Sequence, residues 1–534
     1  MITKNKTRVR FAPSPTGFMH IGNFRSALYD YLFAKKTGGD FILRIEDTDK
    51  KRFVEGAVES LLKTLDWADL KYDEGVFQQA GIKNDKTPVT ESKSYPGVLE
   101  VGEFGPYIQS EKLEVYKKYA EQLVAYGHAY YCFCEPERLE EMRAEQTAAK
   151  RPPIYDRYCL NNVTPEEVNA KLKENCSYTI RLKIPKDETL EFEDAVRGKV
   201  KFETNLVDDQ VLLKSDGFPT YHLANVIDDH DMQITHVIRG EEWLSSTPKH
   251  LLLYRFFGWT PPVFAHLPLL LNADKSKLSK RQGDVAVEDY IKKGYLKEAI
   301  INFVAFLGWN PGNGETQEIF TPEELADKFD MTHVHKGGAV FDLKKLDWIN
   351  SQWIKKISLD DLYRRSLEFL EQKDFYIDTV PEKKLENFVK KVLSVERTRL
   401  LKLSEVGEDA KFFFKDNLHY DTELLRWKDC EDAETKKSLQ LSKETLEKIG
   451  DRDFEFDPEN ETNEALQRIM QTFMQVAEKN FTDESGKIDR GKLLWPLRVA
   501  LTGEQRSPSP FEIMQILGKA ESLSRLGVAI KKLD

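Results

Sequence analysis

Apolar and polar positions near the start of the chain follow two different periods. Thr7–Phe11 is β-branched and alternating, which predicts a strand. Apolar residues then recur at helical spacing, at Phe24, Ala27, Leu28, Tyr31 and Leu32. Asn23 is a good N-cap for this helix, and Gly38-Gly39 ends it. Asp40–Glu46 has the pattern of the next strand, so the whole segment predicts a β-α-β unit.

The turn between the first strand and the helix has residue types suited to holding phosphates. Within the string from Arg10 to Asn23, Gly17 permits a turn that a Cβ would obstruct, and Gly22 lets a base or ribose lie against bare backbone. His20 can donate to a phosphate oxygen at the start of the helix. Far downstream, Lys277-Leu-Ser-Lys-Arg281 is a lysine-rich loop able to close over the same phosphates. Together the strings indicate an enzyme that activates a carboxylate with ATP.

Further patterns divide the remaining chain. Apolar residues at Ala57, Val58, Leu61, Leu62 and Leu65 predict another helix. Residues 78–104 are rich in Lys, Thr, Ser, Gly and Pro, and we expect a solvated loop. A polar helix is predicted around 138–150 and a strand at 178–184. Beyond about residue 358, leucines recur at helical intervals with almost no strand signal.

Composition restricts the class of protein. A chain of 534 residues is too long for one core, so several domains are expected. No apolar run reaches membrane-spanning length and the start has no apolar export segment, which favours a cytoplasmic protein without a membrane partner. The net charge of −11 argues mildly against a nucleic-acid partner. Residues 390–402 gather basic side chains, but such runs are usually solvated helix faces.

Five separated strings resemble the class I aminoacyl-tRNA synthetases, and specifically the bacterial-type glutamyl-tRNA synthetases. Met19–Asn23 and Lys277–Arg281 resemble the two signatures of the class. Three more strings resemble the glutamyl family in particular: Arg44–Asp49, Leu212–Asn225 and Val237–Trp243. The resemblance is strong from about residue 7 to about residue 350 and looser beyond. Many class I enzymes end the first signature with a second histidine where this chain has Asn23, so the role of that histidine is not transferred.

The resemblance implies an α/β protein with a Rossmann-type nucleotide-binding parallel sheet, an inserted acceptor-binding domain and an all-α C-terminal anticodon-binding region. We expect the first half of the catalytic domain at 1–115 and its second half at 206–275. The insertion that grips the tRNA acceptor end would span 116–205. A helical stem-contact domain with the lysine loop would follow at 276–357, and helical anticodon-binding domains at 358–534.

The family implies two reactions: glutamate and ATP give glutamyl-adenylate and pyrophosphate, and the glutamyl group then moves to the terminal ribose of tRNA(Glu). Catalysis would come from positioning and from charge stabilisation at the α-phosphate. His20 and Lys280 would stabilise that charge, with Lys277 assisting from the loop. Mg²⁺ would arrive with the ATP phosphates. The expected ATP-binding residues are Pro13, Thr16, Gly17, His20, Gly22 and Lys280.

Recognition of glutamate can be argued from charge. Its side-chain carboxylate suits an arginine fork, and its ammonium suits an acidic partner. By resemblance, Arg10 and Arg239 bind the γ-carboxylate with Tyr221 as a hydroxyl donor, and Glu46 holds the α-amino group. Ser14 and Asn225 match further polar contacts. The string Asp228-Asp-His-Asp231 suggests a metal site, but the family favours a structural or ribose-contacting turn there.

Other parts of the resemblance concern tRNA and the choice of substrate. Arg397 resembles an arginine near the anticodon, and the family favours a monomer. The glutaminyl enzyme is expected to end in β-barrels, so a helical tail favours the glutamyl enzyme. Four alternatives stay open: an enzyme that also charges tRNA(Gln), a glutaminyl enzyme, a nucleotidyltransferase with the same histidine-glycine turn, and a catalytically silent RNA-binding relative.

The five cysteines do not make a disulfide framework. Cys132, Cys134 and Cys159 match the spacing of a zinc site that some family members carry. Asn161 stands where those members have a histidine ligand, so the site lacks its fourth ligand. Tyr155 or Tyr158 is a candidate replacement. The alternative is a set of three reduced thiols.

Overall fold

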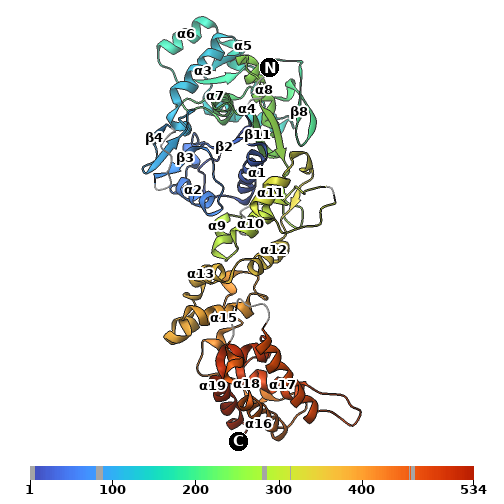
Figure 1. The fold of residues 1–534 in the computed structure, drawn as a ribbon. Helices are drawn as coiled ribbons and strands as arrows, with labels where there is room; N and C mark the ends of the chain where they lie inside the picture. The colour runs from blue at the N-terminus through green and yellow to red at the C-terminus, as the bar shows by residue number, and fades with distance from the viewer. Residues whose placement is uncertain (1–5, 80–87, 279–284, 313, 456–457, 459–462) are drawn as a thin grey trace. The chain divides into compact units, whose positions relative to one another are not determined.

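The structure is a computed structural model, and it describes residues 6–79, 88–278, 285–312, 314–455, 458 and 463–534. The chain divides into two compact units. The first comprises Met1–Ile291 and Ile300–Leu343, and the second comprises Lys292–Ala299 and Lys344–Asp534. In Figure 1 the strands lie in the first unit, drawn from blue to yellow-green.

The first sheet begins with the predicted β-α-β unit. Strand β1 (Arg8–Phe11) pairs in parallel with β2 (Asp40–Leu43), and α1 (Ile21–Thr37) connects them. Gly38 ends α1 in the left-handed conformation, as the sequence predicts. Strand β2 pairs in parallel with β3 (Glu74–Gln78). Helix α2 (Ala57–Trp67) buries the predicted apolar face.

The expectation of a loop over residues 78–104 is wrong in part. Strand β5 (Val98–Val101) pairs antiparallel with β3, and β4 (Val89–Glu91) pairs antiparallel with β5 at the edge of the sheet. Buried Val98 and Val101 flank a polar residue at Glu100, and the ladder with β3 satisfies their backbone groups. The turn-rich composition hid this short strand because it holds only four residues.

A second sheet combines strands from residues 189–203 with strands from residues 236–267. Its order is β11 (His236–Gly240), β12 (Val263–Leu267), β8 (Thr189–Asp194) and β9 (Gly198–Glu203). Thr235 N donates to Arg8 O at 2.9 Å, which sets the start of β11 beside β1. Helix α1 therefore packs across both sheets.

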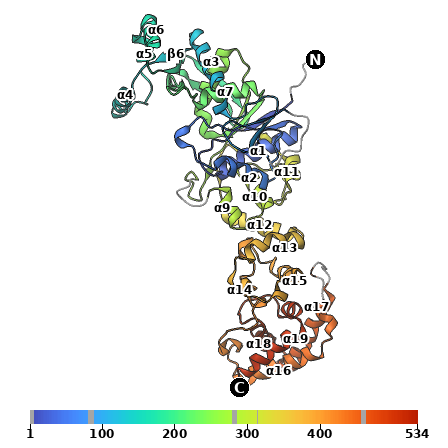
Figure 2. The ribbon, with the colours of Figure 1, turned by 90° about the vertical axis from the view of Figure 1, so that its left-hand side faces the viewer.

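Strand pairing crosses the expected boundary at residue 205 in both directions. Strands β8 and β9 precede it but join β11 and β12, whereas β10 (Val211–Leu213) follows it and pairs with β7 (Thr179–Leu182) and then β6 (Ala129–Cys132). A small apolar core joins β6 to α4 (Pro136–Ala148) and α5 (Tyr158–Asn162), which Figure 2 shows clustered with α6 (Pro165–Lys173).

The first unit also contains a pair of short strands and further helices. The last strands, β13 (Leu270–Leu271) and β14 (Ala339–Val340), pair in parallel. The other helices are α3 (Leu113–Ala125), α7 (Tyr221–Asp231), α8 (Thr247–Phe257), α9 (Val287–Lys292), α10 (Lys297–Ala305) and α11 (Pro322–Lys328).

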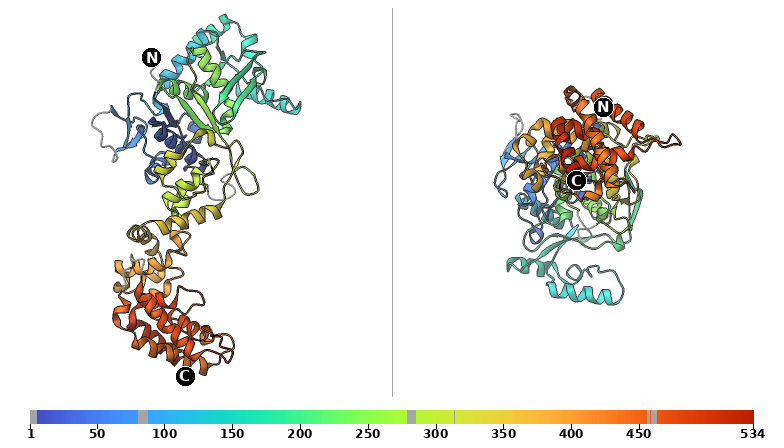
Figure 3. Two further views of the ribbon diagram at one scale, coloured as in Figure 1. Left: turned by 45° about the vertical axis from the view of Figure 1, so that its right-hand side comes forward. Right: turned by 90° about the horizontal axis from the view of Figure 1, so that it is seen from below.

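The second unit is helical, as predicted, and within the part that the structure describes it has no strand. Figure 3 shows its helices in orange and red. They are α12 (Leu343–Lys356), α13 (Leu359–Leu370), α14 (Asp374–Ile377), α15 (Glu386–Glu396), α16 (Asp432–Lys448), α17 (Glu464–Asn480), α18 (Gly491–Thr502) and α19 (Pro510–Lys531). Helices α16, α18 and α19 pack together. Among the described residues, every helix is too short or too polar to cross a membrane.

Candidate active site

Backbone hydrogen bonds join the first predicted phosphate-binding string to the residues that follow the lysine loop. Met19 O accepts from Val287 N at 2.9 Å, and Ile21 N donates to Val285 O at 2.8 Å. At the other end of the lysine loop, Leu278 N donates to Leu270 O at 2.9 Å, and the backbone of Lys277 forms an isolated antiparallel β-bridge with Leu271. Both ends of the loop are therefore anchored, one of them directly beside His20. Lys280 lies outside the described residues.

His20 caps the first helix, and the prediction that Asn23 is the N-cap is wrong. His20 Nδ1 accepts from Gly22 N at 2.9 Å, and Asn23 N already donates to His20 O at 2.9 Å. The imidazole takes one of the first backbone donors, a task that the asparagine side chain usually performs. Because Nδ1 is an acceptor, Nε2 carries the proton of the neutral ring. A Cβ at Gly22 would lie 3.2 Å from His20 Nδ1.

The loop before this helix is tied to the end of the second strand. Glu46 N donates to Pro13 O at 3.0 Å, and Thr16 N donates to Ser14 O at 2.8 Å. Pro13 is buried, whereas Ser14 and Thr16 are exposed. Gly17 has φ of 140°, which favours glycine. The loop thus carries the exposed Ser14 directly after Pro13, which is hydrogen-bonded to the backbone of Glu46.

Arg10 shares a buried carboxylate with a second arginine. Asp229 Oδ1 accepts from Arg10 Nε at 2.9 Å and from Arg44 Nη1 at 2.7 Å. Arg44 Nη2 also donates to Glu46 Oε1 at 2.9 Å. All four side chains are at most 6% exposed. A buried network of this kind is stable only when its charges are paired, so each member fixes the position of the others.

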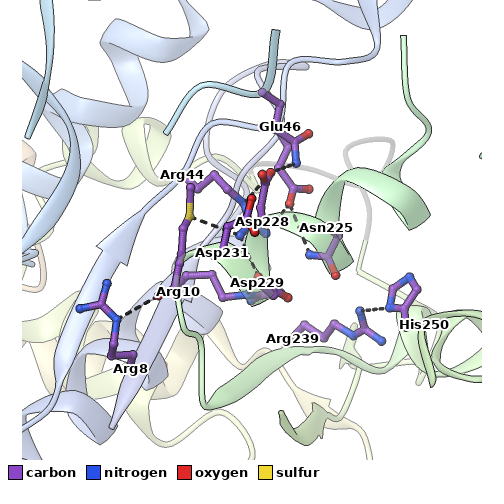
Figure 4. Close-up of polar contacts among 12 residues, drawn as sticks. Arg8, Arg10, Arg44, Glu46, Asn225, Asp228, Asp229, Asp231, Arg239 and His250 are labelled. Carbon is purple, nitrogen blue, oxygen red and sulfur yellow. Dashed lines mark hydrogen bonds and ion pairs between the residues drawn. The ribbon is translucent and has the colours of Figure 1, made fainter. Parts of the chain in front are cut away.

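Asn225 lies among these charges. With its amide oxygen turned toward the guanidinium groups, it accepts from Arg44 Nη2 at 3.0 Å and from Arg10 Nη2 at 3.3 Å. Figure 4 shows Arg10, Arg44, Glu46 and Asp229 gathered together, with Asn225 between them and Arg239. Tyr221 lies one helical turn before Asn225 on α7, and residues four apart share a helix face.

Arg239 approaches from β11 and meets Tyr221. Its Nη1 donates to the Tyr221 hydroxyl at 3.0 Å. The pKa of Tyr221 is raised by burial, lowered by the nearby Arg239 and Arg10 charges, and raised by Glu46. The charges of Arg239, Arg10 and Glu46, which come from remote parts of the chain, therefore all act on the Tyr221 hydroxyl. The structure brings Arg10, Glu46, Tyr221, Asn225 and Arg239 to one place.

The protonation of these groups follows from burial and pairing. Burial lowers the pKa of Arg10, but the charge of Asp229, with smaller contributions from Tyr221 and Asp30, raises that pKa overall. Burial would raise the pKa of Asp229, but Arg10 and Arg44 lower it. Burial raises the pKa of Glu46, with Arg44 opposing. Asp229 is thus held as a carboxylate, and Glu46 protonates more easily than an exposed glutamate.

Sequence reasoning missed the supporting residues of this site. Asp228 and Asp229 lie within helix α7, where Asp228 accepts from Lys112 Nζ at 2.7 Å and from the Tyr116 hydroxyl at 2.9 Å. Gln109 Nε2 also donates to Asp228 at 2.8 Å. The string 228–231 is therefore an ion-pairing element of the core. The feature of the sequence that could have revealed these supporting residues is the pair of adjacent acids on the helix that carries Tyr221 and Asn225.

Family models match nearly the whole chain. The model described as tRNA synthetases class I (E and Q), catalytic domain, matches residues 6–348, and an anticodon binding domain model matches residues 361–530. The chain belongs to the class I tRNA synthetase family, in its E and Q branch.

The relatives of this synthetase share its full length. A protein named glutamate–tRNA ligase from Clostridioides difficile (strain 630) is 46% identical, covering 97% of this chain and 98% of the relative. One of the same name from Chloroherpeton thalassium is 42% identical, and the match covers 100% of this chain and 99% of that relative. The crystal structure of a glutamate tRNA ligase from Elizabethkingia meningosepticum, in complex with its amino acid, matches with a TM-score of 0.81 at 36% identity, covering 99% and 100%.

The synthetase gathers its three predicted cysteine ligands. The sulfur atoms of Cys132, Cys134 and Cys159 lie within 4.8 Å of one another. The Tyr155 hydroxyl lies 3.4 Å from Cys132 Sγ and 3.2 Å from Cys134 Sγ. The Tyr158 ring is instead 45% exposed and lies under Arg138. The three thiols lie close enough together to hold a metal ion, and the Tyr155 hydroxyl is a further polar group within 3.4 Å of two of them.

Arg397 lies at the end of α15 in the second unit of the synthetase. Its Nη2 donates to Ile357 O at 2.9 Å, to Ile354 O at 3.3 Å and to Lys355 O. These carbonyls end helix α12, where backbone acceptors lack helical partners. The guanidinium therefore has a capping contact in addition to any contact with RNA.

Proposed function

We propose that this synthetase is a glutamate–tRNA ligase, which uses ATP to form glutamyl-adenylate and transfers the glutamyl group to the 3′-terminal ribose of tRNA(Glu). The observation that supports it is the convergence of Arg10, Arg239 and Glu46 around one face of α7. A dicarboxylic amino acid needs such a set, with cationic groups for its carboxylates and one carboxylate for its ammonium.

Glutamate would lie along the face of α7 between Tyr221 and Asn225. Its ammonium would bind the Glu46 carboxylate near Ser14, and its γ-carboxylate would bind toward Arg239. Tyr221 accepts from Arg239, so its own hydroxyl hydrogen is available to that carboxylate. Asp229 and Glu46 together offset the charges of Arg10 and Arg44, so the positive charge that remains for the γ-carboxylate is that of Arg239.

ATP would bind beside the start of α1, with its phosphates near His20, Gly17 and Gly22. Pro13 and Thr16 would shape the loop, and Nε2 of His20 would donate to a phosphate oxygen. Lys277 and Lys280 would add positive charge from the loop that is anchored at 285–287. Such charge stabilises the pentacoordinate α-phosphate more than the ground state. Mg²⁺ would accompany the phosphates and supply further charge neutralisation.

The tRNA would contact both units. We assign residues 116–205 mainly to the acceptor end, 276–357 to the inner stem and 358–534 to the anticodon, where Arg397 would read a base. Residues 1–115 and 206–275 would form the catalytic domain, except that β8 and β9 join its sheet and β10 joins the sheet of β6 and β7. A zinc ion held by Cys132, Cys134, Cys159 and Tyr155 would tie β6 to the segment 155–159. We assign the protein to the cytoplasm as a monomer.

Aminoacylation assays test the function directly. Purified protein with ATP and Mg²⁺ should charge tRNA(Glu) with glutamate, and glutamine should be a poor substitute. Equal rates with glutamine would contradict the assignment, and charging of tRNA(Gln) would identify a broader enzyme. Lys280→Ala should raise the activation barrier by roughly 2 to 4 kcal/mol, the range for losing one preorganised charge contact. Lys275→Ala, an exposed lysine earlier in the same segment, is the matched control.

A further inference from the structure

Three neighbouring strands each contribute one polar side chain to a buried row. Arg239 on β11 lies directly opposite His266 on β12, and β12 pairs in turn with β8, which ends at Asp194. Arg239 Nε donates to His266 Nε2 at 3.0 Å, and His266 Nδ1 lies 2.6 Å from Asp194 Oδ2. His266 and Asp194 are both fully enclosed. The buried row therefore runs from the Nε side of Arg239 across the sheet to Asp194.

The chemistry of arginine fixes the tautomer of His266. A guanidinium can only donate, so His266 Nε2 must be the unprotonated acceptor. The neutral ring then carries its hydrogen on Nδ1 and donates to Asp194. Burial lowers the pKa of His266, which keeps the ring neutral. Asp194 Oδ1 accepts from the backbone N–H groups of Val196 at 3.0 Å and Arg197 at 2.8 Å, which immobilises the carboxylate.

The other hydrogens of Arg239 also have neutral acceptors. Nη1 donates to Tyr221 and, at 3.2 Å, to His250 Nδ1. Nη2 donates to Thr247 Oγ1 at 3.0 Å and to Trp243 O at 3.4 Å. The guanidinium is thus held in one orientation, and among the described residues no carboxylate contacts it. Arg10 differs, because Asp229 binds it directly. A substrate carboxylate would displace a neutral acceptor of Arg239, of which Trp243 O, at 3.4 Å, is the most distant.

We propose that Asp194 and His266 are positioning residues that orient Arg239 for the side-chain carboxylate of the amino-acid substrate. This inference rests on the proposed function, which assigns that carboxylate to Arg239. A carboxylate bound directly to Arg239 would compete with the substrate for the same donors. A neutral imidazole placed between them transmits the orienting effect of Asp194 and leaves the positive charge of Arg239 for the ligand.

Asp194→Asn tests the tautomer with almost no change in shape. The amide oxygen can keep the backbone contacts of Oδ1, while the amide nitrogen replaces Oδ2 and donates to His266 Nδ1. His266 would then carry its hydrogen on Nε2, facing the Nε–H of Arg239. We expect KM for glutamate to rise about tenfold or more, with KM for ATP within about twofold, as for the loss of one buried contact to a charged group. Ring nitrogen shifts in histidine-labelled protein should report the change of tautomer.

Two substitutions of His266 separate its two contacts. His266→Gln places a side-chain oxygen near the position of Nε2 and can still accept from Arg239, whereas His266→Asn matches Nδ1 and loses that acceptor. We expect the glutamine variant to stay within about threefold of wild-type KM for glutamate and the asparagine variant to resemble Asp194→Asn. His236→Asn, on the same strand as Arg239 but hydrogen-bonded to Thr235, is the control.

Several outcomes would overturn the inference. Wild-type KM for glutamate in both Asp194→Asn and His266→Asn would remove the positioning role. So would an equal rise in KM for glutamate and ATP, or an unchanged His266 tautomer in Asp194→Asn. If Asp194→Asn does not fold, the comparison of the two His266 variants decides. Failure of the wild-type protein to charge tRNA with glutamate would instead contradict the proposed function.

Discussion

The Nε of Arg10 donates to the Oδ1 of Asp229 at 2.9 Å, although 219 residues separate them in sequence. The same oxygen accepts from Arg44, so one carboxylate neutralises part of the charge of two buried guanidinium groups. This contact connects strand β1 to helix α7 and sets where Arg10 lies relative to Tyr221 and Asn225. The geometry of the proposed glutamate site therefore depends on an acid that need not touch the substrate.

Asp229→Asn should destabilise the first unit because it leaves two buried guanidinium groups without their shared counter-charge. We expect a loss of about 3 kcal/mol, the scale for breaking one partner of a buried ion pair. Denaturant unfolding followed by tryptophan fluorescence measures it. Asp231→Asn is the matched control, since Asp231 is 31% exposed and lies 3.6 Å from Lys112. Equal stability of the two variants would contradict the role given to Asp229.

The pH dependence of glutamate use should report Glu46. Burial raises the pKa of Glu46, and the bound ammonium needs the carboxylate form. Lowering the pH through that raised pKa protonates Glu46, so kcat/KM for glutamate should fall at mildly acidic pH. In Glu46→Gln the value should be low throughout and nearly flat in pH. A variant with the wild-type pH profile would exclude Glu46 as the titrating group.

Metal analysis should distinguish the two tyrosines near the cysteine cluster. We expect purified protein to hold a single zinc ion, and Tyr155→Phe to weaken zinc retention during chelator dialysis because it removes the oxygen nearest the thiols. Tyr158→Phe, which keeps the ring that lies under Arg138, should retain zinc like wild type. Protein without zinc before any chelator treatment would identify the cysteines as three thiols.

The second unit should lose stability as pH rises. Glu396 is 3% exposed, and burial raises its pKa to about 8. Its Oε1 accepts from Gly407 N at 2.8 Å, while Oε2 has no hydrogen-bond partner among the described residues. An unfolded glutamate has a pKa of about 4.3, so between these values the folded state holds a proton that the unfolded state has lost. Stability should therefore decrease with rising pH by roughly 1.4 kcal/mol per unit in this window.

Glu396→Gln isolates that effect because the amide resembles the protonated acid. Melting temperatures of wild type and variant should be similar near pH 5 and should diverge by pH 8.5, with the variant the more stable. Arg364→Gln, an exposed change on α13, should leave the pH dependence as in wild type. Parallel pH curves for wild type and Glu396→Gln would show that Glu396 does not control it.

Local sequence patterns were sufficient for most elements around the site. The periods at 7–11, 24–32 and 57–65 correspond to β1, α1 and α2, because each element has one face that must be buried. They were insufficient at the helix start, where His20 replaces Asn23 as the cap. They were also insufficient at β5, which pairs with β3, and at β4, which pairs with β5. A short strand depends on its neighbour more than on its own composition.

The sequence by itself determined the family, the helical second unit and the residue types that converge on the site, because these depend on local strings and periods. Only the tertiary structure decided which side chains support them. Asp229 reaches Arg10 through helix packing, whereas Asp194 acts on Arg239 through His266, which the register of parallel strands places between them. That register is set by contacts between segments far apart in the chain. Hydrogen bonds act over about 3 Å, so the residues that orient an arginine are determined only when those segments meet.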